Sequence, residues 1–258
     1  MPNFRQLMHR VRAALLLFCL ADTVSPGQQT PKPVRNFSPR KLTYRIEWRL
    51  VNAGTANLDF QRTPSNGWTI DLDLQSAGIV SRLYRVNDKY KVQSSDQFCA
   101  SSVDLDAQEG KRHMITHIGF DNGNHKADYT ERDLIKNTTK KQALDIPPCT
   151  HEIAGALAAL GDLDLQPGKS TTLPITNGKK LVNAKVEAEA KETINVDGKS
   201  YPTTRYEAFL FDNVLYKRKG RLFIWIVDDQ EKTPVQLQIQ LGFPIGTISL
   251  ELEKLQKL

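Results

Sequence analysis

The pair His151-Glu152 has the residue types that come nearest to a known catalytic motif in this chain. It begins like the helical zinc-protease motif His-Glu-x-x-His, in which two histidines on one helical face bind the metal. Gly155 stands where the second histidine should be. Because that ligand is missing, the pair predicts the polar start of a helix and no metal centre.

Two further groups have residue types suited to metal binding or acid–base catalysis. His113 and His117 are four residues apart, so on a strand both would point to one face, but no Cys or Asp spacing completes a metal site. Asp228 and Asp229 are adjacent, and neighbouring strand residues face opposite sides, so these carboxylates should not converge. We predict a polar outer face at the histidines and a hairpin turn at the aspartates. The sequence thus predicts no catalytic residue, no metal site and no cofactor.

The densest basic cluster consists of Lys217, Arg218 and Lys219, followed by Arg221. Such a cluster can contact anionic lipid headgroups or acidic glycans. It is also typical of a solvated hairpin loop that protects a strand edge from pairing with another chain. Both interpretations stay open, and the first makes these four residues a predicted anion-contact surface.

The chain start is typical of a secretion signal. Arg5, Arg10 and Arg12 supply half of the formal net charge of +6, and an apolar stretch over residues 13–20 ends in Cys19-Leu20-Ala21. We predict that residues 1–21 are a cleaved signal peptide and that the protein is exported to the periplasm or cell envelope. The alternatives are an uncleaved anchor or an amphipathic helix.

The rest of the chain is only mildly basic, which argues against nucleic-acid binding. No second apolar stretch approaches the length needed to span a membrane, so no transmembrane segment is expected after signal cleavage. Cleavage would leave Cys99 and Cys149 as the remaining cysteines. An even pair in an oxidising compartment predicts a disulfide, the alternative being two unpaired buried thiols.

Apolar and polar residues alternate along many segments, which is the two-residue period of half-buried strands. Residues 22–40 are rich in Pro, Gln, Ser and Thr and predict a flexible segment, and residues 41–258 predict one β-rich domain. One short helix is expected at about residues 150–160, with Thr150 as its cap and Gly161 at its end. The predicted fold is mainly β, a large antiparallel curved sheet or open β-barrel with that one helix.

Several stretches resemble one known family, in the same order along the chain. They are Leu42–Trp48 with Ala53–Ala56, Gly78–Asp88, Glu109–Arg112, Asp164–Gly168, and Lys219–Asp229 followed by Thr233–Val235. From about Leu42 to Leu255 the chain resembles the domain of unknown function 3108 family of bacterial exported proteins. The resemblance implies export and a β-barrel-like fold, and it supplies no activity and no functional residues. The chain departs from the family at the helix, where the family has Asp at the position of Glu152 and Arg near Gly161.

These observations favour a non-catalytic cell-envelope protein whose open barrel holds a lipid, a glycan or a segment of an envelope partner. This hypothesis predicts an apolar cavity lined by several strands. One alternative is an envelope hydrolase, which needs two or more ionisable side chains that meet in a cleft. The other is a structural or assembly protein, which would expose a large apolar patch in place of a pocket.

Overall fold

The computed structural model describes residues 37–258, which form one large β-sheet and two short helices. The predicted signal peptide, residues 1–21, and most of the predicted flexible segment lie outside the described residues. The strands are β1 (Arg40–Trp48), β2 (Val51–Arg62), β3 (Trp68–Ser76), β4 (Val86–Ser94), β5 (Ala100–Glu109), β6 (Arg112–Asp121), β7 (Lys126–Asp133), β8 (Thr138–Asp145), β9 (Ser170–Thr176), β10 (Leu181–Val196), β11 (Lys199–Ala208), β12 (Gly220–Val227), β13 (Pro234–Leu241) and β14 (Thr247–Lys257). The helices are α1 (Gly78–Leu83) and α2 (Ile153–Leu160).

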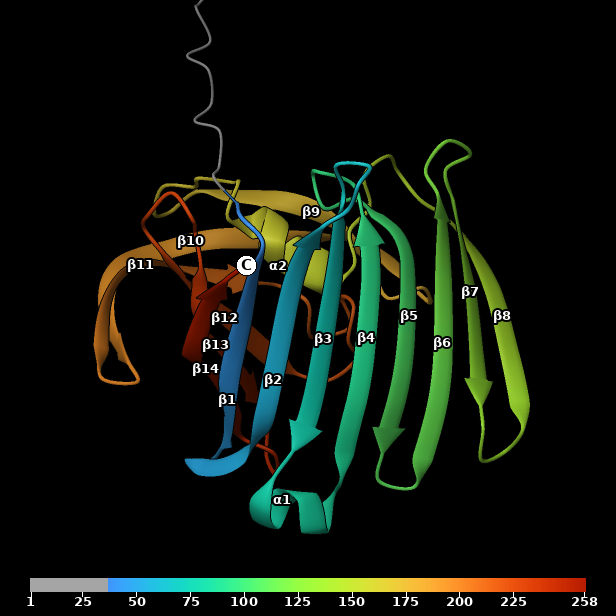
Figure 1. Ribbon diagram of the computed structural model, residues 1–258, viewed down its shortest axis with the longest axis horizontal. Helices are drawn as coiled ribbons and strands as arrows, with labels where there is room; N and C mark the ends of the chain where they lie inside the picture. The colour runs from blue at the N-terminus through green and yellow to red at the C-terminus, as the bar shows by residue number, and fades with distance from the viewer. Residues whose placement is uncertain (1–36) are drawn as a thin grey trace, which may run out of the picture. The chain divides into compact units, whose positions relative to one another are not determined.

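The strands form a single antiparallel sheet in the order β8-β7-β6-β5-β4-β3-β2-β1-β14-β13-β12-β11-β10-β9. Strands that follow one another in the chain are neighbours, except that β8 and β9 are the two edges and β1 pairs with β14. The sheet curls strongly and does not close (Figure 1). The prediction of a mainly β, curved antiparallel sheet is confirmed.

The curl places the apolar face of most strands on the concave side of the sheet. In β2, Ala56, Leu58 and Phe60 are buried, and Leu58 pairs with Leu42 of β1 and Leu72 of β3, so apolar residues form rows across the strands. Because successive side chains of a strand point to opposite faces, the polar residues between them face outward. The alternation that predicts the strands therefore also builds the core.

Helix α2 lies inside the curve of the sheet (Figure 1). It is almost entirely Ala, Leu and Ile, and its residues pack into apolar clusters formed by both halves of the sheet. A helix that is apolar on all sides is typical of a fully buried position. The predicted helix at about residues 150–160 is thus confirmed, although its cap is Glu152 and not Thr150, whose hydroxyl donates to the carbonyl of Pro147.

The prediction of one helix was incomplete, because α1 is a second one. It occupies the segment between β3 and β4 where the two-residue alternation breaks. It is six residues long, has no side-chain cap and buries none of its residues. Because α1 buries no apolar face, the sequence lacks the helical spacing of apolar residues that would predict it. Within residues 37–258 neither helix has the length and apolar character of a membrane-spanning segment.

Candidate ligand cavity

An apolar cavity of about 410 Å³ lies between the concave face of the sheet and α2. Its walls come from β1 to β6, from β13 and β14, from the end of β9 and from α2. The main apolar lining residues are Leu58, Leu74, Leu105, Leu157, Leu237 and Leu250. This volume is within the range of small-molecule sites, which are mostly apolar clefts with a few placed polar groups.

Aromatic residues fill the interior near the β2–β3 and β4–β5 turns. The ring of Phe37 makes edge contacts with Phe60, Trp68 and Phe98 at centroid distances of 5.0, 4.9 and 5.1 Å. Phe60, Trp68 and Phe98 are buried and contribute to the same core cluster as α2. None of these rings lines the cavity, which is walled by residues further along the strands.

The predicted disulfide between Cys99 and Cys149 is present, with a Cα–Cα distance of 4.5 Å. Cys99 directly precedes β5, and Cys149 lies in the segment that leads into α2. The amide of Ala100 donates to the carbonyl of Thr150, so a backbone hydrogen bond adjoins the bridge. The bridge therefore fixes the start of α2 to the sheet.

Glu152 is the acidic residue directly before α2. It is almost fully buried, with 1% of its surface exposed. Its carboxylate accepts hydrogen bonds from the backbone amides of Ala154 and Gly155 and from the hydroxyl of Tyr90, the last at 2.9 Å. Burial raises the pKa of Glu152, and the hydrogen bonds from Ala154, Gly155 and Tyr90 act in the opposite direction. Glu152 caps the helix and anchors Tyr90, which lines the cavity.

Gly155 is required by this cap. A Cβ atom at this position would lie 2.8 Å from Oε1 of Glu152 and 2.9 Å from the carbonyl oxygen of Phe98. His151, which precedes the cap, is buried, and its Nδ1 lies 2.8 Å from the same carbonyl, so Nδ1–H donates to it. Burial lowers the pKa of His151 and favours the neutral ring. The resemblance of His151-Glu152 to a zinc-protease motif thus reflects a helix start packed against the β4–β5 turn.

Asp88 is the carboxylate in the lining of the cavity. It is on β4 in the same inward-facing phase as Tyr90 and Val92, and its Oδ1 accepts the amide of Gln108 at 2.9 Å. Burial raises the pKa of Asp88 to about 6, the charge of Glu109 adds to the rise, and the Gln108 amide opposes it. Asp88 therefore changes charge in the mildly acidic range.

We expect Asp88→Asn to remove one pH-dependent component of stability. Because the pKa of Asp88 is higher in the folded state, ionisation of Asp88 lowers the free energy of unfolding. This loss is absent below about pH 4 and complete above about pH 6. Asn keeps the acceptor for the Gln108 amide and carries no charge. The variant should match the wild type at pH 4 and exceed its free energy of unfolding at pH 7 by about 1 kcal/mol, allowing for solvent screening. Urea unfolding at both pH values measures this, and equal gains at pH 4 and 7 would contradict it.

Within residues 37–258 the histidines and aspartates that the sequence singles out as candidates for acid–base chemistry lie in separate places. His113 lies 2.8 Å from Asp106 and His117 lies 2.7 Å from Asp104, on the outer face of β5 and β6. Asp228 follows β12, eight strands away in the sheet, where its Oδ1 accepts the hydroxyl of Thr204. The next residue, Asp229, accepts backbone amides within the β12–β13 turn, as expected for a turn aspartate. Among the described residues these four side chains share no cleft.

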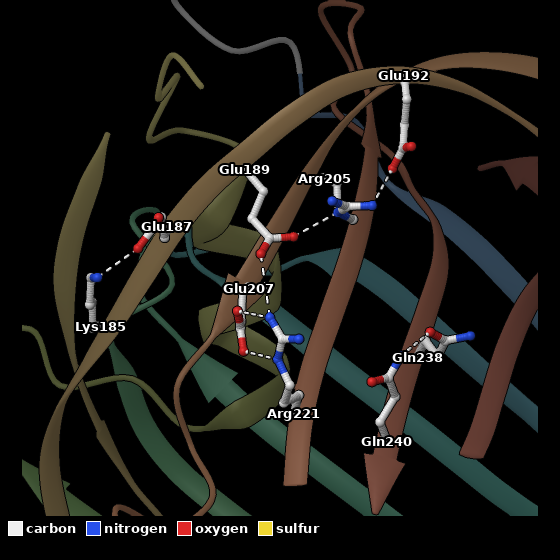
Figure 2. Close-up of polar contacts among 9 residues, drawn as sticks. All are labelled: Lys185, Glu187, Glu189, Glu192, Arg205, Glu207, Arg221, Gln238 and Gln240. Carbon is white, nitrogen blue, oxygen red and sulfur yellow. Dashed lines mark hydrogen bonds and ion pairs between the residues drawn. The ribbon is translucent and has the colours of Figure 1, made fainter. Parts of the chain in front are cut away.

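The predicted anion-contact residues differ in their surroundings. Arg221 makes two hydrogen bonds to the carboxylate of Glu207, at 2.8 and 2.7 Å, and lies 3.6 Å from Glu189 (Figure 2). Its charge is therefore already compensated on the outer face of the sheet. The side chains of Lys217, Arg218 and Lys219 are exposed in the loop between β11 and β12. The contact of this loop with an anion remains a prediction.

Sequence reasoning missed Asp88 and Tyr90 in the lining of the cavity and the role of Glu152, which anchors Tyr90. A signal for Asp88 exists, because it occupies the apolar phase of a strand whose other inward positions are Val86, Tyr90 and Val92. A carboxylate in that phase predicts a buried or cavity-lining acid. Glu152 has no comparable signal, because its role depends on contacts with Tyr90, 62 residues away in the chain.

The described residues thus form an open, β-barrel-like sheet with an internal helix and an apolar cavity. The family described as protein of unknown function (DUF3108) matches residues 43–253, and the chain belongs to this family. The comparison with curated proteins found no match.

Two solved structures are similar to this chain at low sequence identity. A beta-barrel-like protein of domain of unknown function DUF1849 from Brucella abortus has 10% identity and a TM-score of 0.59, covering 87% of this chain and 100% of that chain. A candidate exported protein with a YmcC-like fold from Bacteroides fragilis has 10% identity and a TM-score of 0.38, with the same two coverages. The Brucella structure supports the fold and nothing beyond it.

Proposed function

We propose that the protein is a non-catalytic module of the cell envelope that holds an apolar ligand, a lipid or a lipid-like molecule, in its cavity. The observation that carries the proposal is the cavity of about 410 Å³ walled by leucines from several strands and from α2. A void of this kind loses the contacts that a packed core would have, and an apolar ligand restores them.

The polar groups of the cavity favour a lipid over a glycan. The hydroxyl of Tyr44 donates to the carbonyl of Pro234, that of Tyr90 donates to Glu152, and Asp88 accepts an amide. These groups already have hydrogen-bond partners within the protein. A sugar would need many further donors and acceptors to replace its bound water, whereas an acyl chain needs none.

The location in the cell envelope is supported by two features. Residues 1–21 have the three-part pattern of a secretion signal. Cys99 and Cys149 form a disulfide, a bond that persists mainly in oxidising compartments. Both features agree with a protein that works outside the cytoplasm.

A cavity-filling variant tests the proposal. We expect Leu74→Trp to place an indole in the cavity and to reduce the bound lipid by at least about tenfold, since a loss of about 1.4 kcal/mol in binding has that effect. The matched control is Ile115→Trp, because Ile115 is exposed on β6 outside the cavity lining. Native mass spectrometry of the purified proteins, followed by extraction of the released small molecules, measures occupancy.

The wild type and Ile115→Trp should carry the same apolar molecule, and Leu74→Trp should be empty while retaining the wild-type circular dichroism spectrum. A wild-type protein that carries no apolar molecule and takes up no added fatty acid would refute the proposal. So would equal occupancy in Leu74→Trp and the control.

A further inference from the structure

Five connecting segments meet at the end of the sheet where α1 lies, and we call them the α1 rim. They are residues 49–50, 77–85, 110–111, 134–137 and 242–246. In Figure 1 α1, the β5–β6 turn and the β7–β8 turn all lie at the lower edge of the sheet. The antiparallel strand order requires this placement, because alternate turns of a meander fall at the same end.

The α1 rim exposes large apolar side chains. Phe243 is 97% exposed, Leu50 91% and Leu83 71%, and Ile79 and Ile135 are also largely exposed. Of the exposed large hydrophobic side chains in the described part of the chain, most lie in this rim. Single exposed apolar residues are ordinary, but a group of them at one end of a molecule marks an interaction site.

The charge of the α1 rim is of one sign. Its five segments contain five basic residues and no acidic residue, the basic ones being Arg49, Arg82, Arg85, Lys111 and Lys136. The turns at the other end of the sheet, residues 63–67, 95–99, 122–125, 197–198 and 228–233, contain five acidic residues and one lysine. The two ends of the sheet therefore differ in charge, and the end that exposes apolar side chains is the positive one.

Neighbouring segments of the rim are joined by direct contacts. The indole N–H of Trp48, at the end of β1, donates to the carbonyl of Ile245 at 2.7 Å. The guanidinium of Arg49 donates to the same carbonyl at 3.1 Å. The ring of Tyr84 lies against Gly110, where a Cβ atom would come within 2.8 Å of it. The apolar and basic residues thus belong to neighbouring, mutually supported turns.

The cavity extends toward this end of the sheet. Leu74 and Asp88, which line it, pair with each other two residues from the ends of β3 and β4, and α1 connects those two ends. The loop that carries Lys217 and Lys219 leads into β12 at Gly220, which pairs with Leu241 directly before the rim segment 242–246. That loop therefore adds exposed positive charge beside the rim.

We propose that the α1 rim docks onto the surface of a bilayer that contains anionic lipids. In this position the exposed Leu, Ile and Phe side chains enter the headgroup region, and the arginines and lysines contact lipid phosphates. The proposal deepens the proposed function, because it places the nearer end of the cavity against the source of its lipid. It rests on the rim residues, however, and can hold even if the cavity carries no lipid.

Vesicle binding tests the proposal. The protein is purified from cells that express the full chain, its N terminus is identified by mass spectrometry, and binding is measured by sedimentation with two kinds of vesicle. One kind is phosphatidylcholine alone, and the other is equal parts phosphatidylcholine and phosphatidylglycerol. We expect the wild type to bind only the vesicles that contain phosphatidylglycerol. The double variant Arg82→Gln with Arg85→Gln should bind them about 30-fold more weakly, since each basic residue contributes about 1 kcal/mol. We expect Leu83→Ser to weaken it about tenfold.

Matched variants elsewhere separate a rim effect from a general change of charge or hydrophobicity. Lys140→Gln with Lys141→Gln removes the same charge from the exposed edge strand β8, and Leu258→Ser changes an exposed leucine outside the rim. These should bind as the wild type does, and the lipid content of the wild-type protein tests the cavity separately. Equal binding to both kinds of vesicle, or equal loss in rim and control variants, would overturn the proposal.

Discussion

Glu152→Ala is expected to lower the free energy of unfolding by about 3 kcal/mol, of which about 1 is the lost helix cap and about 2 is the unpaired Tyr90 hydroxyl. The carboxylate accepts two backbone amides and the Tyr90 hydroxyl while almost fully buried. Alanine cannot replace any of these hydrogen bonds, so two backbone amides and the Tyr90 hydroxyl lose their acceptor. Urea unfolding followed by circular dichroism measures the change.

Two milder substitutions separate the contributions at this site. Tyr90→Phe removes the hydroxyl but keeps the ring and the helix cap, so it should cost about 1 kcal/mol. Glu152→Asp keeps a capping carboxylate on a shorter side chain and should lose mainly the contact with Tyr90. If Glu152→Ala were no less stable than Tyr90→Phe, the carboxylate would not be the cap of α2 in solution.

The strands could be predicted from the sequence because their signal is local. In β2 the residues Ala56, Leu58 and Phe60 alternate with polar neighbours, and the structure buries them. The pairing of β1 with β14 has no such signal, since it joins Tyr44 to Leu252 across most of the chain. Local periodicity predicts which face of a strand is buried, but it does not predict which distant strand pairs with it.

The same distinction applies to the candidate site. The Ala- and Leu-rich sequence and Gly161 correctly predict α2. The sequence does not predict that Glu152, in place of Thr150, caps the helix. Thr150 has the preferred residue type, yet its hydroxyl is engaged by Pro147, and Glu152 is favoured by its tertiary contact with Tyr90. The cavity depends on how far β2 to β6 curve away from α2, and no residue pattern along one strand encodes that distance.

The disulfide was predicted from cysteine parity and compartment, and its structural role suggests a second large effect. Cys99→Ala with Cys149→Ala is expected to lower the free energy of unfolding by about 4 kcal/mol, from the chain-entropy estimate for a bridge between residues 50 apart in the sequence. The bridge closes a loop that contains β5 to β8. Without it, folding must order these strands from a less constrained unfolded chain, which costs more conformational entropy.

Reduction supplies the matched comparison for this variant. Wild-type protein unfolded in urea with a thiol reductant should lose the same stability, and the double variant should show no response to the reductant. The loss should also affect α2 first, because Cys149 precedes it and the cap of Glu152 lies three residues further on. Hydrogen exchange at the amides of Ala154 and Gly155 should therefore accelerate more than exchange in β12, which lies far from the bridge in the sheet. Equal unfolding midpoints with and without the bridge would show that the loop is ordered by the sheet alone.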